Sequence, residues 1–133
     1  MTDHTAFVQM LYAAFGRGDL QTILDNCTDD VEWGGNGNPE MVPWGGVRTG
    51  HAGATTFFTA LLSNLDYEAF EPRKFFPAGD MIVVLGFAQA RFKAGGRGMF
   101  ASDWVHVFTI HDGKIARFHE YYDTAAIERA QAV

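Results

Sequence analysis

Two residues near the C-terminal end of the chain, Glu120 and His106, carry side chains that can transfer a proton, and both stand among large rings. Side chains alternate between the two faces of a strand. Extended segments over residues 100–110 and 114–122 therefore give each of the two groups aromatic neighbours on its own face: Trp104 and Phe108 for His106, and Phe118 and Tyr122 for Glu120.

A carboxyl group among rings loses solvation, which disfavours its charged form and raises its pKa toward the range of a general acid or base near neutral pH. His106 could share a proton with Glu120. The opposing interpretation is that the two groups only satisfy one another, or that Glu120 stays in contact with water at the end of its strand.

The turn between these two segments decides whether both groups face the same way. A two-residue loop at 112–113 turns Glu120 outward, whereas a three-residue loop at 111–113 turns it inward and puts Phe118 opposite His106. We expect the three-residue loop, because it joins the more apolar faces and leaves polar residues outside: Asp103, Arg117 and His119.

Helical and extended patterns follow one another along the chain. Apolar residues recur at helical spacing over 7–15, 20–27 and 54–62, with Asp3 and Thr2 available to cap the first helix and Asp19 the second. Four extended segments with hairpin-length links come next, and Asp123 can cap a short last helix: 67–76, 81–92, 100–110 and 114–122. This order predicts an α+β fold, in which helices cover one face of a strongly curved antiparallel sheet and enclose a cone.

Residues 34–50 separate a short extended stretch at 31–33 from the third helix. They contain six glycines and two prolines, a composition that disfavours regular structure. We expect a mobile loop, which is either a lid over the cone or a plain surface excursion.

Composition narrows the classes of function. The 133 residues are the length of one domain, and a net charge of −6 without long charged runs offers no basic surface for nucleic acid. The lone cysteine, Cys27, and the irregular histidine spacing argue against a disulfide and a metal site. No targeting segment and no apolar run near the ~18 residues of a membrane span is present. We expect a cytoplasmic protein.

The order of helices and strands, together with several short motifs, resembles the nuclear transport factor 2-like superfamily, in its SnoaL-like and ketosteroid-isomerase-like branch. The motifs are Gly18-Asp19-Leu20, Asp29-Asp30-Val31, Arg48-Thr49-Gly50, Asp112-Gly113-Lys114-Ile115 and Glu120-Tyr121-Tyr122-Asp123. The resemblance covers nearly the whole chain. It implies a cone-shaped fold, a homodimer through the outer sheet face, and a small hydrophobic ligand in the cone.

Ketosteroid isomerases use an Asp base with a Tyr and a protonated Asp as oxyanion donors. The resemblance puts the tyrosine at Leu11, one place from Tyr12, the base near Gly35, and the second donor at His106. That set of side chains is absent, so steroid isomerisation is not inferred.

Two other branches suggest different acids. Polyketide cyclases similar to SnoaL use a late Asp with a His on the preceding strand, which match Asp123 and His106, whereas phenazine-pathway relatives place a Glu in the last strand, which matches Glu120. We favour Glu120, because Asp123 has a structural role as a helix N-cap worth ~1 kcal/mol.

We therefore expect an acid/base enzyme without a cofactor, which isomerises, cyclises or dehydrates a small apolar carbonyl or ring compound. Glu120 would move the proton, His106 would polarise the carbonyl or share that proton, and Tyr12 or Tyr122 would donate a hydrogen bond. Aromatic side chains would bind the substrate and exclude water: Trp33, Trp44, Phe57, Phe58, Trp104, Phe108, Phe118 and Tyr122. The competing hypothesis is a module that binds a small molecule, or forms a dimer, without chemistry.

Overall fold

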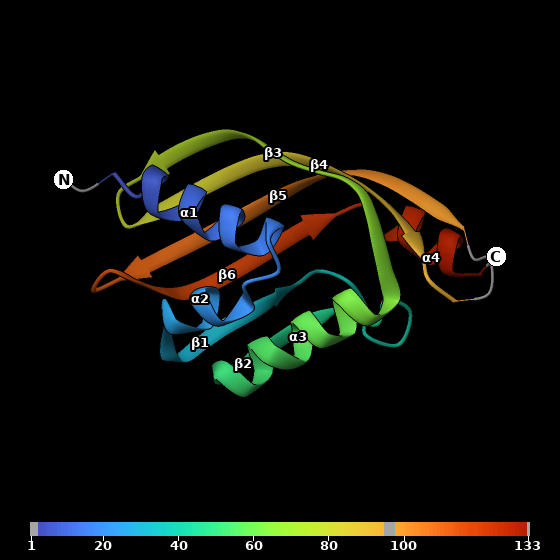
Figure 1. Cartoon of the computed structure of the whole chain (residues 1–133), viewed down its shortest axis with the longest axis horizontal. Coiled ribbons are helices and arrows are strands. Elements are labelled where there is room, and N and C mark those ends of the chain that lie inside the picture. Colours follow the sequence, from blue (N-terminus) through green and yellow to red (C-terminus); the bar gives the residue numbers. More distant parts are fainter. Residues whose placement is uncertain (1–2, 95–97, 133) are drawn as a thin grey trace.

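The computed structural model describes residues 3–94 and 98–132, which form four helices and a six-stranded sheet of order β2-β1-β6-β5-β4-β3 (Figure 1). Thr2 and most of the glycine-rich link at 95–98 lie outside the described residues. The helices are α1 (Thr5–Gly16), α2 (Leu20–Asp25), α3 (Gly50–Asn64) and α4 (Thr124–Ala132), and the strands are β1 (Cys27–Gly35), β2 (Gly46–Thr49), β3 (Leu65–Ala78), β4 (Met81–Phe92), β5 (Met99–His111) and β6 (Lys114–Tyr122).

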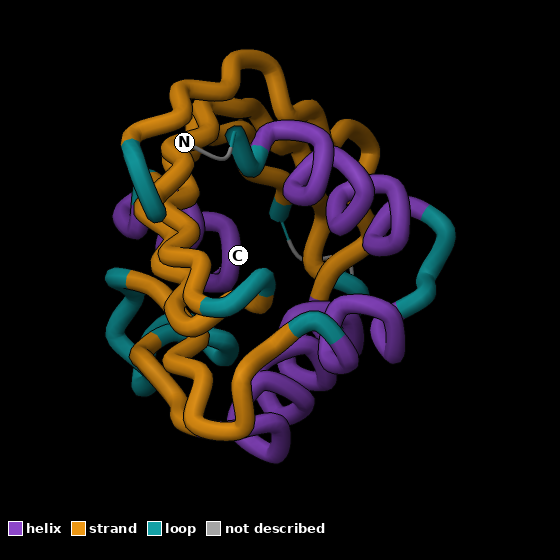
Figure 2. Tube along the Cα trace, turned by 90° about the vertical axis from the view of Figure 1, so that its left-hand side faces the viewer, coloured by secondary structure: helices purple, strands orange, loops and turns teal. Residues whose placement is uncertain are grey.

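The strands curve around an interior that α1, α2 and α3 cover from the opposite side (Figure 2). The apolar faces expected from helical spacing point inward, with Val8, Leu11 and Ala14 buried in α1 and a second set buried in α3: Ala54, Phe57, Phe58 and Leu61. The side chain of Asp19 accepts a hydrogen bond from the Thr22 amide, as expected of an N-cap. The α+β prediction is confirmed.

The segment after α2 is more regular than its composition predicts. Strand β1 begins at Cys27, where the sequence pattern indicated the end of a helix, and it pairs antiparallel with the short β2 inside the expected loop. Val42 and Trp44 are buried in the core. A plain surface excursion is therefore a wrong description of residues 34–50, and a lid motion would have to pull the Trp44 ring out of the interior.

The hairpin between β5 and β6 differs from the expected one. His111 pairs with Lys114 around a two-residue turn, in which Asp112 and Gly113 have φ angles of 50° and 77°. Both residues are left-handed, as a type I′ turn requires. The expected three-residue loop is therefore wrong.

A β-bulge directly after this turn restores the inward direction of the acid. Ile110 pairs with Ile115 but Thr109 pairs with Arg117, so one residue of β6, Ala116, is extra. The slip buries Ile115, which simple alternation places outside, and turns Glu120 inward. Glu120 then lies directly opposite His106, where the sequence predicted Phe118.

Gly86 of β4 makes room for Trp104, its direct partner on β5. A Cβ atom on Gly86 would lie 2.2 Å from Cζ2 of the Trp104 ring. The Trp104 ring stacks on His106 with 3.8 Å between ring centroids. The position of both rings therefore depends on the missing side chain of Gly86.

We expect Gly86→Ala to lower the free energy of unfolding by about 1–3 kcal/mol, because the added methyl group overpacks the Trp104 ring. Urea denaturation measures the change. Gly16→Ala is the matched control, because a Cβ there meets nothing within 4 Å. Equal stability of the two variants would contradict the close packing of Trp104.

Candidate active site

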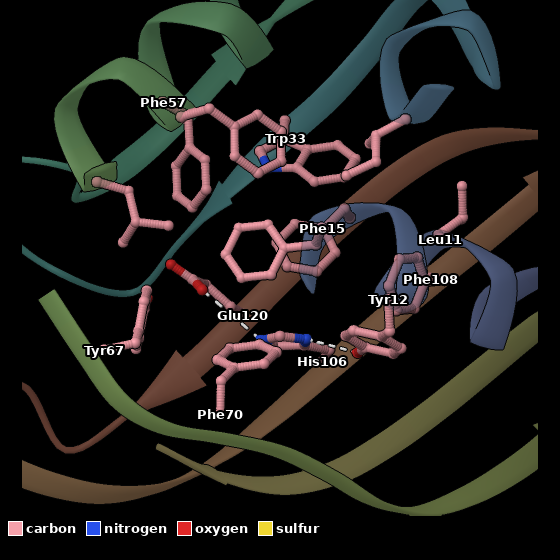
Figure 3. Close-up of a pocket in the computed structure, with 14 residues that line it drawn as sticks. Leu11, Tyr12, Phe15, Trp33, Phe57, Tyr67, Phe70, His106, Phe108 and Glu120 are labelled. Atoms are coloured by element: carbon pink, nitrogen blue, oxygen red, sulfur yellow. Dashed lines mark hydrogen bonds and ion pairs between the residues drawn. The ribbon is translucent and has the colours of Figure 1, made fainter. Parts of the chain in front are cut away.

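The largest group of aromatic side chains surrounds an internal cavity of about 50 Å³ beneath α1, α2 and α3 (Figure 3). Its wall combines rings and aliphatic side chains from the helices with the inner face of β1, β3, β5 and β6. The lining residues are Leu11, Tyr12, Phe15, Ile23, Trp33, Phe57, Phe58, Leu61, Tyr67, Phe70, His106, Phe108, Phe118 and Glu120. Few polar groups interrupt this apolar wall.

A second cavity of about 40 Å³ lies on the side of α4 and the 36–45 loop. Three aromatic residues that were expected to bind substrate line this second cavity and not the first: Trp44, Trp104 and Tyr122. Five residues belong to the walls of both cavities: Leu61, Tyr67, Phe70, His106 and Glu120. The acid and the imidazole therefore stand where the two spaces meet.

Three polar side chains form a row along the cavity wall. The Tyr12 hydroxyl lies 2.7 Å from His106 Nδ1, and His106 Nε2 lies 3.7 Å from Glu120 Oε1 (Figure 3). Only 5% of His106 and 8% of Glu120 is exposed. Sequence reasoning brought Glu120 and His106 together correctly. It named Tyr12 or Tyr122 as a hydrogen-bond donor in the reaction, whereas the structure shows the Tyr12 hydroxyl hydrogen-bonded to His106.

Burial controls the protonation of all three groups. It raises the pKa of Glu120 to about 8 and lowers the pKa of His106 to about 3, because the charged form of each loses its water. Burial also raises the pKa of Tyr12. At neutral pH the acid and the imidazole are therefore mainly uncharged, and their 3.7 Å contact is not an ion pair.

The hydrogen bonds define what each polar atom can offer a ligand. We assign the Tyr12 hydroxyl as the donor to His106 Nδ1, which places the ring proton on Nε2. A separation of 3.7 Å from Glu120 is too long for a hydrogen bond, so this N–H is not bonded to the acid, and His106 lines the cavity. Oε2 of Glu120 is also buried without a hydrogen-bond partner among the described residues.

Asp123 does not reach either cavity. It is exposed, and its Oδ1 accepts a hydrogen bond of 3.0 Å from the Ala126 amide at the start of α4. Its expected role as an N-cap is confirmed. The Asp123 amide donates in turn to the Ser102 hydroxyl, which fixes the start of α4 against β5.

Sequence reasoning missed part of the cavity wall. Tyr67 and Phe70 both point inward although strict alternation sends them to opposite faces, because a bulge at Glu68 shifts the register of β3. Leu11, Phe15 and Leu61 had a usable signal, since each belongs to an apolar helix face.

Within 3–94 and 98–132, no three His, Cys, Asp or Glu side chains gather as a metal site would require. None of the helices described in this range is long and apolar enough to cross a membrane.

The two buried groups make the stability of the protein depend on pH in opposite directions. Glu120 releases its proton near 4.5 when unfolded and near 8 when folded, so the folded state holds the extra proton between these values and loses stability as pH rises. His106 has the reverse effect between about 3 and 6.5, because the unfolded state holds its extra proton. The effect of Glu120 therefore stands alone above pH 6.5.

We expect the wild-type protein to lose stability from pH 6.5 to 8, by up to about 1.4 kcal/mol per pH unit. Glu120→Gln, which keeps the shape but cannot titrate, should lack this loss. Urea unfolding of both proteins at several pH values measures the difference. Parallel stability curves would show that Glu120 is already ionised at pH 6.5.

Comparison with known proteins identifies relatives that share the fold of this chain. Residues 8–118 match the family model of the SnoaL-like domain. A nuclear transport factor 2-like protein from Burkholderia xenovorans is 33% identical over 98% of each chain, with a TM-score of 0.85. One from Burkholderia pseudomallei is 26% identical over the full length of both chains, with a TM-score of 0.88.

A third solved structure carries the name of a ligand. TerC, co-crystallised with polyporic acid, is 31% identical over 92% of each chain, with a TM-score of 0.79. No curated protein matches the chain. On the family match and these identities, the chain belongs to the SnoaL-like domain family of the nuclear transport factor 2-like superfamily.

Proposed function

We propose that the protein is an acid/base enzyme without a cofactor, which moves a proton on a small apolar carbonyl or ring compound. The observation that carries the proposal is the position of Glu120, whose carboxyl group is buried in the wall of an aromatic cavity. Burial raises the pKa of this carboxyl group to about 8. A group with this pKa passes between acid and base near neutral pH, as proton transfer requires.

The Glu120 carboxyl group and His106 Nε2 suggest a mechanism for the reaction. The carboxylate form of Glu120 takes a proton from the carbon next to the substrate carbonyl. The electron pair moves onto the carbonyl oxygen, which accepts a hydrogen bond from His106 Nε2. Glu120 then returns the proton to a carbon of the same system, which completes an isomerisation and leaves the enzyme unchanged.

Tyr12 acts behind the imidazole. Its hydroxyl donates to Nδ1 and so holds the ring proton on Nε2, where it faces the substrate. The rings of the wall replace the water that would otherwise solvate the developing charge. A cavity of about 50 Å³ holds only a few waters, so rings such as Phe15 and Phe70 must move apart to admit a substrate.

A relative that was co-crystallised with polyporic acid supports the proposal that this chain binds a small molecule. It is 31% identical to this chain, and its ligand is the natural first probe of binding. Membership of the SnoaL-like family is compatible with this reading, although a shared fold does not choose an activity.

We expect the wild-type protein to catalyse exchange of the α-protons of 1-indanone, a small aromatic ketone, with deuterium from D₂O. The rate should rise with pH and level off above about 8, since the carboxylate is the active base. Glu120→Gln should lower it by at least about 10²-fold. Proton NMR measures the exchange.

Asp123→Asn is the matched control, because Asn caps a helix as well as Asp does and Asp123 lies outside both cavities. It should exchange at the wild-type rate. Full activity of Glu120→Gln would discard Glu120 as the proton carrier. A wild-type protein that binds polyporic acid or the ketone without exchange supports the non-catalytic binding module.

We also propose that the outer sheet face joins two copies of the chain. Leu85, Val105 and Tyr121 form an apolar row across three neighbouring strands. Leu85 is 37% exposed and Tyr121 45% exposed, which is unusual for large apolar side chains in so regular a row.

We expect light scattering to report a dimer for the wild-type protein and a monomer for Leu85→Lys/Tyr121→Lys, because the two charges cannot be buried unpaired in the contact. Met41→Lys is the control, since Met41 is as exposed but lies in the 36–45 loop. A wild-type monomer, or a double variant that remains dimeric, would rule out this face.

A further inference from the structure

Gly35, near the end of β1, is the direct partner of Glu120 on the parallel strand β6. Along β1, Val31 and Trp33 point into the core, so position 35 points inward as well. A Cβ atom on Gly35 would lie 2.5 Å from Glu120 Cγ and 2.8 Å from the Glu120 carbonyl oxygen. The Glu120 side chain therefore occupies the space that a side chain at position 35 would fill.

The backbone itself does not require glycine at this position. Gly35 is absent from the glycines with positive φ, so an ordinary residue could adopt its conformation. A glycine inside a strand weakens the strand and often marks a close approach of another group. Its neighbour Gly34 has a different role, since a Cβ there would lie 2.1 Å from the backbone oxygen of Gly46 on β2.

We propose that Gly35 is a positioning residue for the acid: its missing side chain lets Glu120 lie against β1 with its carboxyl group beside His106, so that side chains at 35 and 120 exclude one another. The inference rests on the proposed role of Glu120 only for its effect on catalysis. The packing of the two positions stands without it.

The contact with Glu120 has two parts, which a double-mutant cycle separates. Gly35→Ala presses on the side chain and the carbonyl oxygen of residue 120 and on Cε1 of Tyr122, which a Cβ atom would approach to 3.2 Å. In a Glu120→Ala background only the contacts with the oxygen and with the Tyr122 ring remain. We expect Gly35→Ala to raise the unfolding equilibrium constant roughly 10- to 100-fold in the wild type and clearly less in the Glu120→Ala background.

Catalysis supplies a second readout. Gly35→Ala should lower the exchange of 1-indanone protons by about 10²-fold, because even a 1 Å displacement of a catalytic group has effects of this size. The midpoint of the pH profile should also move, since the displaced carboxyl group changes its contact with water. A purely structural glycine would change stability and leave this midpoint in place.

The sharpest test moves the carboxyl group from β6 to β1. Gly35→Asp/Glu120→Ala puts a carboxyl group into the same space from β1. We expect the new carboxyl group of this double variant to titrate well above 4.5, which carbon-13 NMR measures. The double variant should also exchange protons at least about tenfold faster than Glu120→Ala alone.

The outcomes separate the two proposals. An equal effect of Gly35→Ala in both backgrounds, or a carboxyl group at position 35 that titrates normally, would overturn the positioning role. A wild-type protein without exchange activity removes the proposed reaction, but the stability cycle and the carboxyl titration still decide the role of Gly35.

Discussion

The loss of water around two ionisable side chains is the constraint on which the interior depends. A charge moved into a cone of rings without a close partner is expensive, and Glu120 and His106 avoid this by staying uncharged. The Tyr12 hydroxyl serves as a neutral partner of the imidazole, because no carboxylate among the described residues lies within hydrogen-bond distance of His106. The same aromatic wall that gives the fold its core thus raises the pKa of Glu120 to about 8. The packing of the core and the unusual pKa of its acid have the same cause, which is burial.

Much of this interior could be predicted from the sequence, because alternation in strands and spacing in helices depend only on local geometry. That both groups face inward was predicted, but the register that puts Glu120 directly opposite His106 was not. A type I′ turn and a three-residue loop are both compatible with the residues around Asp112, and the bulge at Ala116 compensates for the difference. The prediction was wrong about the length of the turn and did not include the bulge, and these two errors have opposite effects on the direction of Glu120. The inward direction of the acid was therefore predicted correctly for the wrong reason. The available signal was Ile115, an isoleucine on a face that otherwise carries Arg117 and His119.

Composition misled where tertiary contacts override it. Glycine and proline suggested a mobile segment after Trp33, yet two of its apolar side chains, Val42 and Trp44, are held in the core and its end forms β2. The inward turn of both Tyr67 and Phe70 depends on the bulge at Glu68, which no periodicity reveals. Asp123 shows the opposite situation, in which local sequence is sufficient. Its role as an N-cap depends only on neighbouring residues, and it was predicted correctly.

The two borders of the sheet differ from its centre. Strand β2 is four residues long, and β3 contains Pro72 and Pro77 as well as shifts of register at Glu68 and at Arg73. Proline has no N–H to offer a ladder, and a kinked or very short border gives an incoming strand little to pair with. These borders therefore disfavour fibril-like growth by strand addition, in which backbone groups rather than side chains select the partner.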